Sequence, residues 1–336
     1  MLRASTTRIA LAALIVRGCL AAPAEPERLI EAGHWKRARV LVEARIAEAP
    51  ADPLANFLLS QVRNAFGDRD SPLPLAEKAV ALDGRTARYH RQVAECLGVM
   101  AQHSNPIQQV LLARRFRSEI DRALALDPRD AQARRDLMEF YLLAPAIVGG
   151  DSRRATETAA RLREVDPLAG LLAQARLADY RKRTADAEAC LRRAAEIQPP
   201  SYRARVDLAG LFVAGVPPRF DDARRSAADA LALDAGRVDA YAILADIHAA
   251  RGDLAALDAV LDAAARAVPD DLTPFYRAAL RLLASGRDLP RAEGYLRTYL
   301  AQPPEGNAPS AADARAQLAQ VLEKRRRTVA QSGRPR

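Results

Sequence analysis

Histidine is the side chain best suited to proton transfer or metal binding at neutral pH, and the sequence holds four: His34, His90, His103 and His248. They are scattered along the chain. The sequence also lacks the motifs that place a catalytic serine, a phosphate, a dinucleotide or a catalytic zinc: G-x-S-x-G, G-x-x-x-x-G-K-[ST], G-x-G-x-x-G and H-E-x-x-H. We therefore expect no catalytic residue, no bound cofactor and no metal ligand.

Two histidines have a structural interpretation. His90 and His248 occupy positions where the helical pattern calls for a large core residue, so we expect them to be packed. His103 lies in an irregular segment, and with nearby Asp151 it supplies the only ionisable pair on which an enzyme site could be built. The cysteines Cys96 and Cys190 lie inside separate helical stretches, too far apart for a disulfide, and are interpreted as small buried hydrophobes.

The composition favours an all-helical protein without a nucleic-acid partner. Hydrophobic residues make up 49% of the 336 residues but aromatics only 5%, so the core must consist mainly of Ala, Leu and Val. The net charge of +9 is concentrated at the two ends. Leaving out nine cations and one anion there gives a charge of +1 for residues 25–322. A neutral body does not favour binding to nucleic acid.

The first 24 residues resemble a secretory signal peptide. Arg3 and Arg8 precede an apolar run at 9–16, and Ala22-Pro23-Ala24 fits a small-x-small cleavage site. The run is too short to span a bilayer, which needs about 20 residues, so we expect no transmembrane segment in the mature chain. We predict a periplasmic or otherwise exported protein. The alternatives are a lipoprotein anchored at Cys19 and a cytoplasmic protein with an unprocessed leader.

A turn residue recurs after Ala/Leu-rich helices through most of the chain, with spacings of 34, 44, 39, 32, 36, 34 and 35 residues. These turn residues are Pro50, Gly84, Pro128, Pro167, Pro199, Ala235, Pro269 and Pro304. A fixed period of this length is the signature of a helical repeat array. An isolated helical hairpin cannot cover its own apolar face, so repeats must stack on one another.

The best-preserved unit is YAILADIHAARGDLAALDAVLDAAARAVP, residues 241–269. It resembles the tetratricopeptide repeat (TPR) family, whose 34-residue unit carries a W-x2-L-G-x2-Y pattern on its first helix. The matching positions are Tyr241, Leu244, Ala245, His248, Gly252, Leu257, Leu261, Ala264 and Pro269. The resemblance implies an all-α, TPR-like solenoid of about eight helical hairpins over residues 25–308. We expect a capping helix at 309–327, started by Ser310 and Asp313, and a disordered basic tail at 328–336.

Two units are longer than the rest, and both insertions fall between the two helices of a repeat. The first, near 99–112, should lengthen both helices around a turn close to Asn105-Pro106. The second, near 144–148, should form a short extended flap with Pro145, Ile147 and Val148, followed by Gly149-Gly150 and a helix capped by Asp151 or Ser152. The stretch 144–151 is similar to turns in uncharacterised exported bacterial TPR-like proteins. The flap either covers apolar surface of its neighbours or forms a binding edge.

The concave groove of the stack is the second candidate surface, because the family lines it with first helices. The outward positions of those helices predict eight groove residues: Arg88, Arg91, Glu95, Gln132, Arg135, Glu139, Arg176 and Arg203. Cations prevail in this set, which suits an acidic or C-terminal peptide but equally a solvated charged face. With only four lysines, the chain lacks the Lys/Asn constellation of the family members that bind chaperone tails.

These features together predict a non-enzymatic scaffold for a protein or peptide partner whose identity the sequence leaves open: an exported bacterial assembly or maturation factor that is monomeric. An enzyme with its site at the edge formed by 99–112 and 144–148 is the alternative. A helical-repeat protein that binds nucleic acid is a weaker one, because the body is neutral and the leader indicates export.

Overall fold

The structure, a computed structural model, describes residues 25–332, and this part of the chain is built from helices without a strand. Sixteen helices pair into eight successive hairpins: α1 (Pro26–Ala32) with α2 (Trp35–Glu48), α3 (Pro53–Ala65) with α4 (Pro72–Leu82), α5 (Ala87–Gln102) with α6 (Pro106–Leu126), α7 (Ala131–Leu143) with α8 (Ser152–Val165), α9 (Pro167–Tyr180) with α10 (Thr184–Glu196), α11 (Tyr202–Ala214) with α12 (Phe220–Leu233), α13 (Asp239–Arg251) with α14 (Leu254–Ala267), and α15 (Thr273–Ser285) with α16 (Leu289–Leu300). A last helix, α17 (Ala311–Ser332), packs on α16 and α15. The expected solenoid of eight hairpins with a terminal helix is confirmed.

Single residues in the sequence mark where many of the helices start. Eight of the sixteen paired helices begin after a residue whose side chain accepts a hydrogen bond from a free backbone N–H of the first turn: Asp52, Asn105, Asp130, Asp151, Asp166, Ser201, Asp253 and Asp288. Proline often follows such a residue, where its missing N–H costs nothing. Asp166 alone connects α8 to α9, ending one helix and capping the next.

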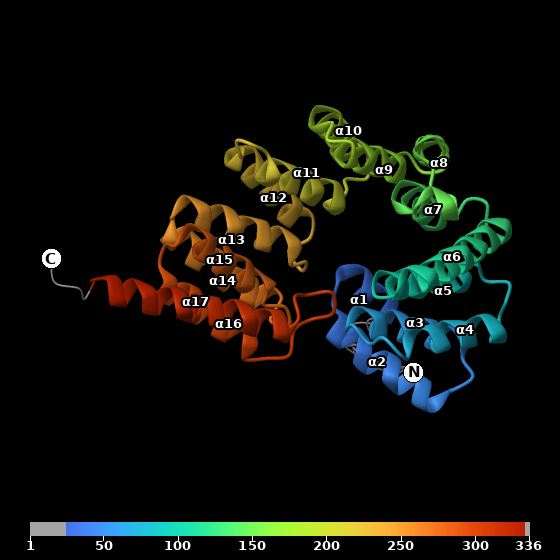
Figure 1. Cartoon of the computed structure of the whole chain (residues 1–336), viewed down its shortest axis with the longest axis horizontal. Coiled ribbons are helices and arrows are strands. Elements are labelled where there is room, and N and C mark those ends of the chain that lie inside the picture. The colour runs from blue at the N-terminus through green and yellow to red at the C-terminus, as the bar shows by residue number, and fades with distance from the viewer. Residues whose placement is uncertain (1–24, 333–336) are drawn as a thin grey trace, which may run out of the picture.

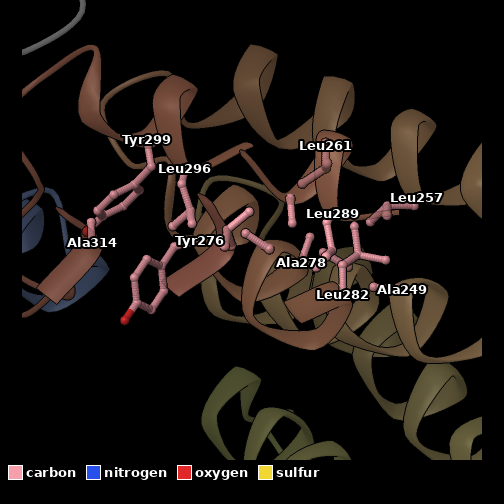
Figure 2. Close-up of a cluster of buried hydrophobic side chains, with 14 residues drawn as sticks. Ala249, Leu257, Leu261, Tyr276, Ala278, Leu282, Leu289, Leu296, Tyr299 and Ala314 are labelled. Carbon is pink, nitrogen blue, oxygen red and sulfur yellow. The ribbon is translucent and has the colours of Figure 1, made fainter. Parts of the chain in front are cut away.

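From α7 to α16 the first helix of each hairpin lies on the inner face of the array, and the hairpins follow one another around an arc (Figure 1). Second helices turn alanines toward the first: Ala155 and Ala159 of α8, like Ala223 and Ala227 of α12, are fully buried. The largest buried cluster runs from α13 to α17. In Figure 2 its leucines and tyrosines from successive helices interdigitate without a break between repeats. In this part of the array the core therefore continues across repeat boundaries, as stacking requires.

The two insertions take different forms. The first lengthens α5 and α6, which are joined by a short turn at 103–105. The second is not the expected extended flap, because residues Ala146–Val148 form a 3-10 helix, η1. Pro145 ends the preceding helical run, and the Val148 and Gly149 amides then donate to the carbonyls of Pro145 and Ala146. Gly150 is required here, since a Cβ would lie 1.7 Å from the Ala144 carbonyl oxygen.

The last helix begins as the sequence indicated and ends later. Ser310 Oγ accepts from the Asp313 amide, and Asp313 accepts in return from the Ser310 amide, which forms a reciprocal cap. α17 continues to Ser332 instead of ending at Arg327, so residues 328–332 of the predicted tail are helical. The reason is that no helix breaker occurs before Gly333. Residues 1–24 and 333–336, including the predicted signal peptide, lie outside the described residues.

The first two hairpins contact two loops from the other end of the array, at 268–272 and 301–310 (Figure 1). The Lys36 amide donates to Glu305 Oε1 at 2.7 Å, and Lys36 Nζ donates to the Asp270 carbonyl at 2.6 Å. The Asn307 amide donates to the carbonyl of Ala65, the last residue of α3, at 2.7 Å. These bonds join residues more than 230 positions apart and close the arc of hairpins into a ring.

The packing of α8 against α9 predicts a stability test at Gly170. A Cβ at this buried position would lie 2.2 Å from Arg163 Cα, because the single-residue connection forces the two helices together. Gly170→Ala should lower the free energy of unfolding by about 3 kcal/mol, the cost of overpacking a core. Gly294→Ala in α16 is the matched control. With no atom within 4 Å of its Cβ, it should stabilise by up to about 1 kcal/mol through helix propensity. Thermal unfolding of both variants checks the pair, and an unchanged Gly170→Ala would show that the helices do not pack this closely.

Candidate binding groove

The inner face of the array encloses a cavity of about 1270 Å³ lined by first helices. Residues from α7, α9, α11, α13 and α15 form its walls, so the cavity runs across five consecutive repeats. Because each wall is a helix packed into the core, the cavity is held by rigid elements and does not depend on loops.

Aliphatic side chains make up the floor of the cavity. Leu172 of α9, Val206 and Val213 of α11, and Ile243 of α13 are half-buried and line it. At the centre of α11, Gly210 leaves open space, since nothing lies within 4 Å of the position of its absent Cβ. The middle of the groove is thus both apolar and roomy.

Ion pairs between and along first helices flank this floor. Arg281 of α15 forms two hydrogen bonds to the Asp246 carboxylate of α13, at 2.7 and 2.6 Å. Arg176 Nε of α9 lies 3.1 Å from Glu139 Oε1 of α7. Arg203 pairs with Asp207 one turn later on α11, at 2.7 Å. These three guanidinium groups are thus already paired with carboxylates of the protein itself.

Two arginines of the groove lack a close carboxylate partner among the described residues. Arg277 of α15 makes no ion pair with any described residue, and Arg135 of α7 reaches only Asp136, at 3.7 Å. Both side chains are exposed in the cavity. They are the guanidinium groups available to a ligand.

Carboxylates outnumber cations in the cavity lining, contrary to the expectation that cations prevail. The arginines are Arg135, Arg176, Arg203, Arg277 and Arg281; the acids are Asp136, Glu139, Asp166, Asp179, Asp207, Asp239 and Asp246. That expectation included at most three positions on any first helix. It therefore left out Asp179 of α9, Asp207 of α11 and Asp246 of α13. The groove is therefore of mixed charge.

One of these acids titrates near neutral pH. Burial raises the pKa of Asp136 to about 6, although the nearby Arg91 and Arg135 guanidinium groups favour its charged form. Burial also raises the pKa of Asp207, with Arg203 opposing. The charge of the groove thus changes over a pH range that cells encounter.

The structure separates the eight predicted groove residues into two sets. Gln132, Arg135, Glu139, Arg176 and Arg203 line the cavity, and Arg88, Arg91 and Glu95 of α5 do not.

The α5 residues connect neighbouring helices instead. Arg88 pairs with Glu27 of α1 and lies over the ring of Phe57, 5.2 Å from its centroid. Glu95 accepts a hydrogen bond from Asn64, and Arg91 extends toward Asp136 at 3.7 Å. The sequence reasoning missed Arg277, Arg281 and Asp246, which occupy inward positions of later first helices; extending the same projection to α13 and α15 would have found them.

The edge carrying the insertions is largely solvent-exposed. Ile147 is 78% exposed and Ile107, on α6, is also 78% exposed. Pro145 is exposed and Val148 half-buried. The apolar surface beneath is covered by other residues, since Phe140 stacks on Phe116 with ring centroids 5.6 Å apart. Ile147 therefore does not serve as a cover for its neighbours.

The histidines and cysteines have local roles where they are described. His90 is buried, with Nδ1 2.8 Å from Glu119 Oε2, and burial lowers the pKa of half-buried His248. His103 is exposed at the end of α5, and Asp151 is engaged in capping α8. Cys96 and Cys190 are free thiols.

The described residues offer neither a metal site nor a membrane span. Between residues 25 and 332, no three His, Cys, Asp or Glu side chains are placed to hold a metal ion. No helix in that range has both the length and the apolar composition to cross a bilayer.

Solved structures share this arrangement of helices. The thermophilic TPR protein TTC0263 of Thermus thermophilus superposes with a TM-score of 0.50 at 20% identity, over 56% of this chain and 95% of that one. Yeast Tom70 superposes with a TM-score of 0.58 at 15% identity, over 89% of this chain and 60% of Tom70. The fold is TPR-like. No protein-family model matches the sequence, and no curated protein matches it significantly.

Two residues on either side of the end of α7 should respond differently to substitution, because one is exposed and the other buried. Ile147→Ser should leave the melting temperature unchanged within about 1 °C, because a surface substitution usually changes stability by less than about 0.5 kcal/mol. Phe140→Ala should cost about 3–5 kcal/mol, because it removes a buried ring from the stack with Phe116. Differential scanning calorimetry distinguishes the two. A large drop in the melting temperature of Ile147→Ser would support the alternative that the insertion covers apolar surface of its neighbours.

Proposed function

We propose that the protein is a non-enzymatic scaffold that binds an extended segment of a protein partner in the groove. The observation that carries the proposal is the open, apolar centre around Gly210, flanked on both sides by charged side chains on rigid helices. Stacked helical repeats use their concave surface for binding in this manner. The TPR-like neighbours support the same general role, and the choice of partner rests on the groove itself.

The charges of the groove favour a partner segment of mixed polarity. Arg135 and Arg277 are free to bind carboxylates, with the two parallel hydrogen bonds that guanidinium geometry allows. Asp179 and Asp239 are exposed and make no ion pair with a described residue, so they can receive a Lys or Arg of the partner. Apolar side chains of the segment would then lie on Leu172, Val206 and Ile243. A uniformly acidic peptide would meet repulsion from the groove carboxylates.

A plug at Gly210 tests the proposal. Peptides are selected from a displayed random library on the full chain, and their affinities for two variants are then measured by fluorescence anisotropy. Gly210→Trp fills the open space and should weaken binding by at least about tenfold, which corresponds to ~1.4 kcal/mol. Gly294→Trp places the same side chain at an exposed helical glycine outside the cavity and should bind as the unmodified chain does. Equal affinities for both variants would overturn the groove as the binding site.

We further propose that this scaffold is an exported assembly or maturation factor. The support is the leader: two arginines, an apolar run at 9–16 and a small-x-small sequence before Glu25. Mass spectrometry of the protein purified from a producing bacterium should find an N-terminus at Glu25 and a periplasmic location. A chain that starts at Met1 and stays in the cytoplasm would contradict export, and a lipid-modified Cys19 would replace it with membrane anchoring.

A further inference from the structure

The contact that closes the ring also caps the N-terminus of α2, for which the first hairpin supplies no side-chain acceptor. α2 starts after His34, whose side chain makes no capping hydrogen bond. Glu305 supplies the missing acceptor from the other end of the array, because its Oε1 accepts from the Lys36 amide in the first turn of α2. A carboxylate at this position also interacts favourably with the positive end of the helix. The loop at 301–310, called here the closing loop, therefore caps α2 across the ring.

The closing loop is shaped to fit the first hairpin closely. Gly306 lies on Trp35, the only tryptophan of the chain, and a Cβ at position 306 would lie 2.6 Å from both Cβ and Cγ of Trp35. The next residue, Asn307, has a positive φ of 62° and directs its amide to the Ala65 carbonyl. Both features hold the loop against α2 and α3.

Opposite charges face each other across the same contact. Arg37 forms an ion pair with Asp270, and Lys36 Nζ binds the carbonyl of that residue. Asp271 and Glu305, which are 6% and 4% exposed, lie close enough for the Lys36 charge to act on both. The contact thus combines hydrogen bonds and charges with one aromatic side chain.

This contact also carries an unfavourable component. Glu305 Oε2 is buried without a hydrogen-bond partner, and burial raises the pKa of both Glu305 and Asp271. Buried carboxylates regain full hydration when a contact opens, which offsets part of what the hydrogen bonds contribute. A contact of this composition is suited to opening and closing while the repeats themselves stay folded.

We infer that the closing loop is a latch on the ring and that its release admits a partner chain to the groove. While the loop holds the first hairpin, the two ends of the array are joined, so no gap between them admits an internal segment and a long polypeptide must thread an end. Once the closing loop separates from α2 and α3, the two ends of the array can move apart, and an internal segment of the partner can enter through the gap between them. The inference rests on the groove being the binding site, and it adds a gate to that site.

Trp35 reports the state of the latch directly. Gly306→Val should expel the loop, shift the Trp35 emission to longer wavelength, increase its quenching by acrylamide and enlarge the radius of gyration in X-ray scattering. Arg37→Glu provides a second route, because it places a like charge beside Asp270 without adding bulk, and it should shift Trp35 in the same direction. Arg85→Glu, at an exposed arginine with no ion pair to a described residue, is the charge control and should leave the emission unchanged. An unshifted Trp35 in both latch variants would overturn the contact.

Access to the groove is measured with a reporter thiol that needs no natural ligand. Gly210→Cys is introduced with Cys19→Ser, Cys96→Ala and Cys190→Ser, and its reaction with N-ethylmaleimide is compared with that of a bulky reagent, a maleimide coupled to a small folded protein, which cannot thread the ring. Adding Gly306→Val or Arg37→Glu should raise the rate of the bulky reagent by about tenfold, as the open state becomes dominant, and leave the small reagent unchanged. A shifted Trp35 with an unchanged bulky-reagent rate would overturn the gate. Failure of the peptide experiment at Gly210 would instead overturn the binding function, since the labelling does not depend on it.

Discussion

The whole molecule depends on the inability of one helical hairpin to bury its own apolar face. Each first helix has to be covered by its own second helix and by the next repeat, and the fully buried alanines of α8 and α12 are what allow the helices to approach closely. Burying each larger side chain such as Leu257 or Leu296 contributes about 1.5–3 kcal/mol, but only because a neighbouring repeat is present. The same requirement sets the first helices from α7 to α15 side by side on the inner face, and so it creates the groove as a by-product of stability.

The groove shows how a stack of this kind combines rigidity with selectivity. Most of its arginines already bind a carboxylate of the same or the adjacent first helix, as Arg281 does with Asp246. These pairs fix neighbouring helices relative to one another and leave little free charge on the walls. What remains for a partner is a small number of uncommitted groups around an apolar centre, an arrangement that favours specific contacts over general electrostatic attraction.

Much of the fold could be predicted from the sequence, because the period, the capping residues and the apolar positions are local signals. Asp130, Asp166 and Asp253 mark helix starts where the structure has them. The groove was harder to predict. Position along a helix places Arg135 and Arg176 correctly, but it cannot show that Arg88 turns aside to pair with Glu27, because that depends on how far α1 leans over α5. The extended flap predicted at 144–148 is wrong for residues 146–148, because the glycines after them indicate a turn without specifying its type.

Closure of the ring lay beyond sequence reasoning altogether, since no periodic signal connects Lys36 to Glu305. It also has a consequence for how the chain folds. Almost every other contact forms between adjacent repeats and can appear as soon as two of them exist, whereas the bond between these two residues spans 269 positions and needs all eight hairpins in place. Contacts of such long range form slowly because the entropy of closing the intervening loop must be overcome first. The cap on α2 therefore forms only after the rest of the array has folded, so the completed ring is a signature of a chain that has folded along its whole length.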